Sequence, residues 1–272
     1  MSDINLWNLP DLQVGSEADD SLIERRNNSR FATPLIEGAV VREESVAGVQ
    51  CLIVSSAQPK FSYLHLHGGG FRLGWTRTWL NYASDIALKA DCQVVIPDYR
   101  LAPEHPYPAA LVDAVGVYAE LQSAGEVFVG GDSAGGGLAL SLTLAARDSK
   151  HQMPAGLVLL SPWLDLAATA ASYEKNASTD TMFSRESAEQ AAVAYLGTCA
   201  TTDPLASPAY GGFSQVPKVL IFVSASEVLL DDAVQFAKKA RQKGNDFLTS
   251  IHCLCGINHD YRPNMWHVFH HM

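Results

Sequence analysis

The chain has 272 residues, of which 47% are hydrophobic and 18% are charged. This composition excludes a disordered or fibrous chain and is typical of a globular protein. The formal net charge of −10 argues against nucleic acid or an anionic membrane as a partner. Five scattered cysteines without a CxxC pair indicate neither a disulfide framework nor a zinc site, so we expect a cytoplasmic protein without a metal or cofactor.

Short apolar runs alternate with longer helical patterns from Glu37 onward, which predicts an α/β protein with a mostly parallel sheet covered by helices on both faces. The predicted strands are Val49–Val54, Tyr63–Leu66, Gln93–Pro97, Val127–Gly130, Gly156–Leu160, Val219–Ser224 and Leu248–Leu254. The predicted helices are Leu80–Ala90, Tyr107–Ser123, Ala134–Asp148, Arg185–Leu196 and Leu230–Lys243. Residues 1–40 are polar with few apolar anchors, and we expect them to form an appendage to one domain spanning 1–272.

The segment Glu126–Leu138 joins an apolar strand, the pattern G-x-S-x-G and an Ala/Leu-rich helix. This context predicts a nucleophile elbow that exposes the Ser133 hydroxyl at the edge of the sheet. Glycines flank the turn because a Cβ would collide with the neighbouring strand and helix. A glycine-rich turn or a phosphate-binding loop is the alternative, but no Lys follows the glycines as a P-loop requires.

A glycine run, His67-Gly-Gly-Gly-Phe71, follows the predicted strand Tyr63–Leu66. A tetrahedral oxyanion needs fixed N–H donors at about 3 Å, and backbone without side chains can approach that closely. The run precedes G-x-S-x-G by one strand-helix unit, which is the position of an oxyanion loop in α/β-hydrolases.

Four motifs in register resemble those of the hormone-sensitive-lipase-like (bacterial family IV) esterases. They are His67–Phe71, Asp98–Ala110 (DYRLAPEHPYPAA), Gly131–Gly137 and Ser161–Leu166 (SPWLDL). The resemblance extends from about Val40 to the C-terminus. It implies an eight-stranded α/β-hydrolase sheet, oxyanion donors from Gly69, Gly70 and Ala134, and an N-terminal helical cap formed by residues 1–40.

The remaining motif residues have structural explanations. We expect Asp98 and Arg100 to pair and brace the loop beside the glycine run, and Asp165 to act as a helix N-cap or loop brace. The aromatic residues Phe71, Trp75 and Trp79 either line the substrate pocket or belong to the core.

The acid of a catalytic triad should follow the strand Val219–Ser224, because the chain order in such hydrolases is Ser, acid, His. The resemblance aligns Glu227 with the catalytic acid, where the family usually has Asp. Glu is chemically acceptable since the acid orients the imidazole and stabilises its charged form. Asp231 is the alternative, although a carboxylate at a helix start is also favourable by itself.

The family places its histidine about thirty residues after the acid, in the pattern Pro-x-Met-x-His-[Gly/Val]-Phe. Pro263–Phe269 matches this pattern and supplies His267, forty residues after Glu227. His259 has better spacing but a poorer motif. We favour His267 because loops absorb insertions, whereas local motif geometry does not. The family continues with a helix beyond the position of Met272, so a homodimer contact in its place is one expectation.

The resemblance therefore predicts a carboxylesterase for small esters with short to medium acyl chains, which acts through Ser133, Glu227 and His267 and an acyl-enzyme. Two alternatives remain open. The same triad could hydrolyse a lactone, amide or carbamate, or the chain could be a non-catalytic small-molecule receptor on the same fold, a class that usually lacks the base.

Overall fold

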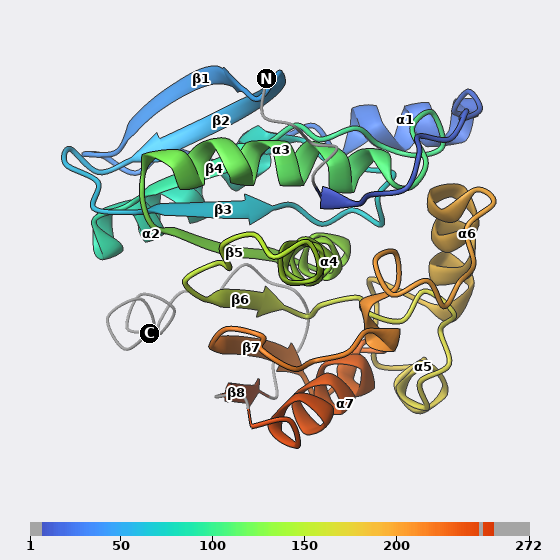
Figure 1. Cartoon of the computed structure of the whole chain (residues 1–272). Helices are drawn as coiled ribbons and strands as arrows, with labels where there is room; N and C mark the ends of the chain where they lie inside the picture. Colours follow the sequence, from blue (N-terminus) through green and yellow to red (C-terminus); the bar gives the residue numbers. More distant parts are fainter. Residues whose placement is uncertain (1–6, 245–246, 253–272) are drawn as a thin grey trace.

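A single eight-stranded sheet organises the protein (Figure 1). The computed structural model describes residues 7–244 and 247–252. The strands are β1 (Val40–Val46), β2 (Val49–Ser55), β3 (Ser62–Leu66), β4 (Gln93–Pro97), β5 (Val127–Asp132), β6 (Leu157–Leu160), β7 (Val219–Ser224) and β8 (Phe247–His252). They lie in the order β1-β2-β4-β3-β5-β6-β7-β8, and β2 pairs antiparallel with both β1 and β4, whereas all other pairs are parallel.

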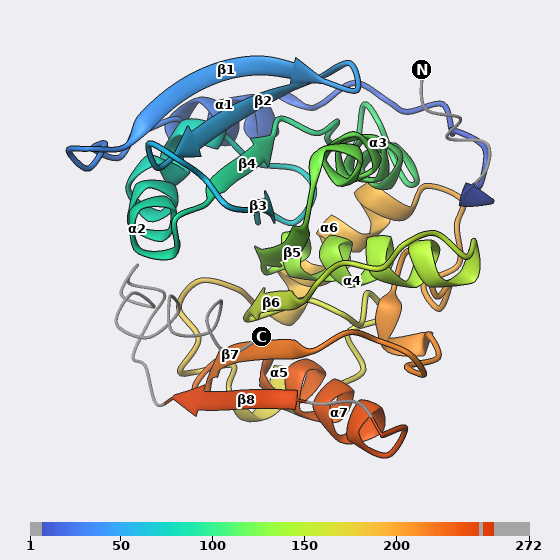
Figure 2. The ribbon, with the colours of Figure 1, turned by 60° about the vertical axis from the view of Figure 1, so that its left-hand side comes forward.

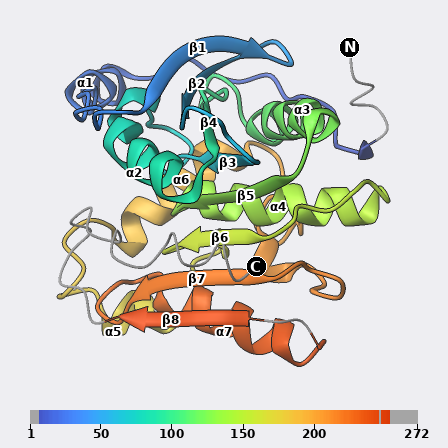
Figure 3. The same cartoon turned by 90° about the vertical axis from the view of Figure 1, so that its left-hand side faces the viewer.

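Helices cover both faces of this sheet (Figures 2 and 3). They are α1 (Asp20–Asn28), α2 (Leu80–Ala90), α3 (Ala109–Ala124), α4 (Ala134–Asp148), α5 (Ser172–Lys175), α6 (Arg185–Leu196) and α7 (Leu230–Arg241), with short 3₁₀ turns at Thr76–Trp79 and Pro208–Tyr210. The apolar side of α2 packs in one core, and those of α3, α4 and α7 pack in a second core across the sheet. None of the helices in the described ranges is long and apolar enough to cross a bilayer.

The predicted elements are present, with ends shifted by one or two residues, and the α/β prediction is confirmed. The last two residues of the strand predicted at Leu248–Leu254 lie outside the described residues. The strand β1 was not predicted from the pattern, although the family resemblance implied eight strands. It is an edge strand whose residues are mostly exposed, so it shows no apolar run. A two-residue turn joins it to β2, in which Ala47 and Gly48 both have positive φ (51° and 85°), as a type I′ hairpin requires.

Arg26 fixes the N-terminal segment to the sheet domain. Its guanidinium forms two hydrogen bonds with the carboxylate of Glu104, at 2.5 and 2.8 Å. It also donates to the carbonyl oxygens of Ala102 and Arg72. Because this side chain lies on α1, the helix is held against the loop that follows β4 and the loop that follows β3.

Gly135→Ala tests the tight contact between α4 and β3. A Cβ at this position would lie 1.9 Å from the Leu66 carbonyl oxygen, and backbone cannot move away cheaply. We expect the free energy of unfolding, measured with urea, to fall by about 3 kcal/mol. Gly212→Ala is the control, since an added Cβ there meets nothing within 4 Å and should change stability by less than about 0.5 kcal/mol. Equal stability of the two variants would contradict the contact.

Candidate active site

Ser133 occupies a sharp turn between β5 and α4. Its backbone has φ 51° and ψ −120°, a conformation that residues with a side chain rarely adopt. The Ser133 N–H donates to the Leu160 carbonyl oxygen at 2.9 Å, and its own carbonyl oxygen accepts from the Trp163 N–H. A Cβ at Gly131 would lie 2.2 Å from the Leu66 carbonyl oxygen. The predicted elbow geometry and the need for flanking glycines are confirmed.

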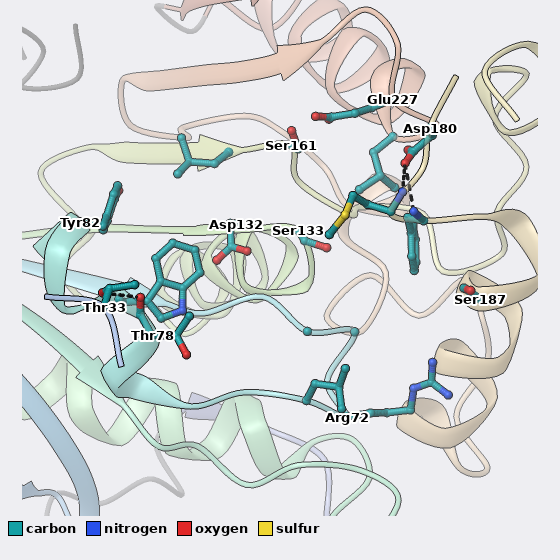
Figure 4. Close-up of a pocket in the computed structure, with 18 of the residues that line it drawn as sticks. Thr33, Arg72, Thr78, Tyr82, Asp132, Ser133, Ser161, Asp180, Ser187 and Glu227 are labelled. Carbon is teal, nitrogen blue, oxygen red and sulfur yellow. Dashed lines mark hydrogen bonds between the residues drawn. The ribbon is translucent and has the colours of Figure 1, made fainter. Parts of the chain in front are cut away.

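A cavity of about 580 Å³ opens at this end of the sheet (Figure 4). Ser133, Glu227, Gly69 and Gly70 all border it, although they come from three loops far apart in the sequence. Among residues 7–244 and 247–252, no group of three or more His, Cys, Asp or Glu side chains gathers closely enough to hold a metal ion. The structure thus brings four of the predicted site residues to one cavity.

The glycine run forms a tight turn after β3. Gly69 and Gly70 have φ values of 120° and 62°, which glycine adopts without strain. The Gly69 carbonyl oxygen accepts from the N–H groups of Arg72 and Leu73. A Cβ at Gly69 would lie 2.2 Å from the Leu73 carbonyl oxygen, so no other residue fits this turn.

Asp132 anchors the glycine run, a role that the sequence analysis did not assign. Its Oδ1 accepts from the Gly68 N–H at 2.7 Å and lies 3.7 Å from Nε2 of His65. Burial raises the pKa of Asp132 to about 7 and lowers that of His65 to about 3, so the histidine is neutral at physiological pH. The available signal was an acidic residue directly before the predicted nucleophile.

His67 supports the same loop from beneath. Its ring stacks on Tyr99 at a centroid distance of 4.2 Å, and its Nδ1 lies 2.9 Å from the Gly68 carbonyl oxygen. The Tyr99 hydroxyl donates to the His67 carbonyl oxygen. The His67 side chain is fully buried, which lowers its pKa. His67 is therefore a structural residue and does not border the cavity.

The two candidate acids occupy different environments. Glu227 is 6% exposed and borders the cavity, and its carbonyl oxygen accepts from the Asn176 side chain at 2.6 Å. Asp231 lies in the first turn of α7, where its Oδ2 accepts from the Ser172 N–H at 2.9 Å. Asp231 does not border the cavity. Both candidate histidines, His259 and His267, lie outside the described residues.

The predicted pair of Asp98 and Arg100 is wrong. Arg100 instead binds Asp113 of α3, with its Nη2 2.8 Å from Oδ1. The Arg100 backbone N–H also donates to Asp113, so one carboxylate holds both the main chain and the side chain. Asp98 is exposed. Sequence proximity misled the prediction because the partner comes from the following helix.

Two other motif predictions have clear outcomes. Asp165 is a loop brace, since its carboxylate accepts from the N–H groups of Ala167 and Thr169. Trp79 borders the cavity, whereas Phe71 lies in the core and stacks on Tyr195 at 3.7 Å between centroids. Trp75 does not border the cavity.

Two chain segments outside the sheet also line the cavity. Thr33 and Pro34 come from the N-terminal segment, while Met182 and Phe183 come from the stretch before α6. Asp180 holds that second stretch, because its Oδ1 accepts from two backbone N–H groups there and its Oδ2 accepts from the backbone N–H beside Glu227. The family resemblance implies a cap from residues 1–40 only, so the contribution of Met182 and Phe183 was not predicted.

Asp232→Asn tests how a buried carboxylate in α7 changes the free energy of unfolding with pH. Asp232 is 5% exposed, and its pKa is raised to about 7, chiefly because burial disfavours the charged form. The folded protein thus keeps a proton that the unfolded chain releases near pH 4, so this residue lowers the free energy of unfolding progressively as pH rises from about 4 to about 7.

Asparagine removes this titration but keeps an acceptor oxygen for the N–H groups of Leu164 and Asp165, which Asp232 Oδ2 now binds. We expect the variant to gain stability relative to the wild type as pH rises through that window. Urea unfolding of both proteins at about pH 4 and about pH 7.5 measures the change. A difference in stability that is independent of pH would contradict the assigned pKa shift.

Known proteins resemble this chain over most of its length. The sequence pattern of the α/β-hydrolase fold matches residues 63–270. An esterase of Acinetobacter venetianus is 36% identical over 214 residues, covering 77% of this chain and 70% of its own length. An acetyl-hydrolase of Streptomyces hygroscopicus is 35% identical over 211 residues, covering 76% of this chain and 67% of its own.

Solved structures agree with these relatives. The crystal structure of an esterase from the bacterial hormone-sensitive lipase family superposes with a TM-score of 0.81 at 32% identity and covers 92% of both chains. The crystal structure of the esterase EstE5 soaked with p-nitrophenyl butyrate has a TM-score of 0.84 at 30% identity, covering 97% of this chain and 92% of its own. The chain thus belongs to the α/β-hydrolase fold family, among its hormone-sensitive-lipase-like esterases, and is a carboxylesterase of the serine hydrolase class.

Proposed function

We propose that this enzyme hydrolyses small esters with short to medium acyl chains through a triad of Ser133, Glu227 and His267. The observation that carries the proposal is the elbow at Ser133, which borders one cavity together with the buried Glu227 and the glycine run. Nothing in ordinary packing requires a strained serine, a buried carboxylate and two side-chain-free residues around the same empty volume.

The reaction proceeds by acyl transfer. His267 removes the proton from the Ser133 hydroxyl while the oxygen attacks the ester carbonyl carbon, and the alcohol leaves with that proton. Water, deprotonated by His267, then attacks the acyl-enzyme, and the acid leaves as Ser133 regains its proton. Glu227 orients the imidazole and stabilises its charged form between these steps.

The hydrogen-bond pattern supports the choice of oxyanion donors. The Gly68 N–H is bound by Asp132, and the Ser133 N–H is bound by the Leu160 carbonyl oxygen. This leaves the N–H groups of Gly69, Gly70 and Ala134, which the family resemblance implies as donors, as the ones we propose for the oxyanion. Ala134 is the first residue of α4, so the helix dipole also favours the negative oxygen.

The size of the cavity supports the proposal of a small substrate. Its volume of about 580 Å³ lies within the range of volumes of small-molecule pockets. The names of the relatives, an esterase and an acetyl-hydrolase, support the same class. Residues 1–40 would serve as a cap, because Thr33 and Pro34 already border the cavity.

We also place the enzyme in the cytoplasm. Cys51, Cys92 and Cys199 are free thiols, and burial raises the pKa of the first two to about 12. Free buried thiols suit a reducing compartment. The homodimer stays a prediction.

The test combines turnover with active-site labelling. The purified chain is expected to hydrolyse p-nitrophenyl butyrate, and phenylmethylsulfonyl fluoride should abolish this activity by modifying one serine. Mass spectrometry of the labelled protein should locate the adduct on Ser133. Turnover without an adduct there would overturn the proposed nucleophile, while faster turnover of a lactone or amide would reassign the substrate. Binding of these compounds without turnover would identify a receptor.

A further inference from the structure

Two arginines border the cavity that contains Ser133. Arg25 lies in the last turn of α1, and Arg72 follows the glycine run directly. Figure 4 shows Arg72 and Ser187 of α6 on the side of the cavity away from Tyr82. The ester of a bound substrate would lie at Ser133, so these guanidinium groups would face another part of the same molecule.

Neither of these arginines has a carboxylate partner within the described part of the chain, in contrast to most others. Arginines that form an ion pair are Arg26, Arg42, Arg77, Arg100, Arg147 and Arg185. Carboxylates are not scarce, since the chain has 29 Asp and Glu against 19 Lys and Arg. Arg30 also forms no ion pair with the described residues, but it does not border the cavity, so Arg25 and Arg72 are distinguished by combining an unpaired guanidinium with a place on the cavity wall.

Arg72 is held in an unfavourable position for a cation. Its partial burial lowers its pKa, and the charge of Arg25 lowers it further, while Asp19 opposes both effects. Arg25 is exposed and Arg72 is half-buried, so an anion bound at both guanidinium groups would relieve their mutual repulsion. Carboxylate and phosphate groups are suitable anions, because two of their oxygens can accept the parallel N–H groups of one guanidinium.

The carboxylates that border the cavity are engaged elsewhere. Both oxygens of Asp180 accept backbone N–H groups. Asp132 binds the Gly68 N–H, and its pKa is raised to about 7. Glu227 serves the imidazole in the proposed triad. Asp19, which acts on Arg72 from outside the cavity, accepts the Leu22 N–H as the N-cap of α1 and forms no ion pair with Arg72. The guanidinium groups of Arg25 and Arg72 are therefore available for a ligand.

The backbone around Arg72 is fixed before any ligand binds. Its N–H donates to the Gly69 carbonyl oxygen at 3.1 Å, and its own carbonyl oxygen accepts from the Arg26 side chain at 2.8 Å. Both bonds use main-chain atoms of Arg72, so a substitution that removes only its guanidinium keeps them. The two adjacent arginines of α1 therefore have different contacts. Arg26 binds Glu104 and holds the helix in place, whereas Arg25 borders the cavity.

We propose that the preferred substrates are esters that also carry a negatively charged group, a carboxylate or a phosphate, which Arg25 and Arg72 bind while the ester lies at Ser133. This inference rests on the proposed function and names its substrate class. The cavity thus offers Ser133 and the glycine run for the ester, and Arg25 and Arg72 for a second, anionic part of the same molecule.

The test compares three esters of one size. They are 4-(butyryloxy)benzoate, 4-(butyryloxy)phenyl phosphate and the neutral 4-(butyryloxy)benzamide. We expect kcat/KM for at least one anionic ester to exceed that for the neutral ester by about tenfold, mainly through KM. This ratio should fall as salt is raised from about 20 mM to about 500 mM, since salt screens the attraction. The arm with the higher ratio identifies carboxylate or phosphate as the recognised group.

Variants separate recognition from intrinsic ester reactivity, because all three esters are compared in each variant. Arg25→Met and Arg72→Met should each lower the ratio of anionic to neutral kcat/KM by about fivefold or more. Arg30→Met is the matched control: Arg30 is an exposed arginine just after α1 that does not border the cavity, and its loss should leave the ratio unchanged.

The outcomes distinguish this inference from the proposed function. Turnover of the neutral ester with no preference for either anionic ester, and with ratios unchanged in both arginine variants, would overturn the inference and leave the esterase proposal intact. Failure of all three esters to react would overturn both. Loss of the preference in Arg30→Met as well would show that overall charge, and not the cavity arginines, is responsible.

Discussion

Replacing Ser133 by Ala is expected to lower kcat/KM for p-nitrophenyl butyrate by at least ~10³-fold. In the proposed mechanism the Ser133 hydroxyl oxygen bonds to the acyl group, and alanine at the strained turn between β5 and α4 has no nucleophilic atom to replace it. The loss of activity should not be complete, because the proposed oxyanion donors and substrate binding still accelerate hydrolysis without the nucleophile. The measurement is steady-state hydrolysis at several substrate concentrations.

Ser187→Ala is the matched control for this prediction. Ser187 also borders the cavity but lies on α6, away from the elbow. We expect its removal to change kcat/KM for the same neutral ester by less than about threefold. Thermal unfolding of Ser133→Ala should match that of the wild type, which excludes misfolding as the cause. Wild-type activity in a folded Ser133→Ala protein would refute the nucleophile.

His267→Ala is expected to cause a loss of similar size, at least ~10³-fold, because the base and acid of both half-reactions would be absent. His259→Ala should retain most of the activity. This contrast depends on the sequence motif around His267, since both histidines lie outside the described residues. The opposite result would assign the base to His259, and full activity in both variants would contradict the triad.

A second pair of variants tests the acid in the same assay. Glu227→Gln keeps the shape of the side chain but removes its charge, and we expect a loss of about 10²-fold or more. Asp231→Asn should keep its activity near the wild-type value, since Asp231 binds the Ser172 N–H and does not border the cavity. A large loss in Asp231→Asn alone, with unchanged stability, would reverse the assignment of the acid.

Local patterns predicted most of the secondary structure. The apolar runs of the inner strands are continuous because both faces of these strands are buried, so β3, β5 and β7 stood out in the sequence. The edge strand β1 was not predicted, because most of its residues are exposed and its central residues are polar or charged. The same reasoning explains the failed pair of Asp98 and Arg100, where α3 supplied a carboxylate that no local pattern indicated.

The cavity wall shows the limit of sequence reasoning most clearly. The glycine run and the elbow each consist of consecutive residues, so the sequence motif alone predicted their backbone geometry. By contrast, Met182, Phe183 and Arg25 border the same cavity only because segments from distant parts of the chain converge there. The role of Asp132 was equally hidden, since its partner, Gly68, lies 64 positions away.

The sequence by itself determined the α/β class, the elbow at Ser133 and the tight glycine turn after β3, because each depends on neighbouring residues or on periodicity along one strand or helix. Only the tertiary structure decided that Glu227, and not Asp231, borders the cavity with Ser133. It also decided that Arg100 binds α3 and that two arginines border the cavity without partners among the described residues. The physical reason is that burial, ion pairing and shared cavity walls arise between segments whose separation in the sequence carries no information about their separation in space.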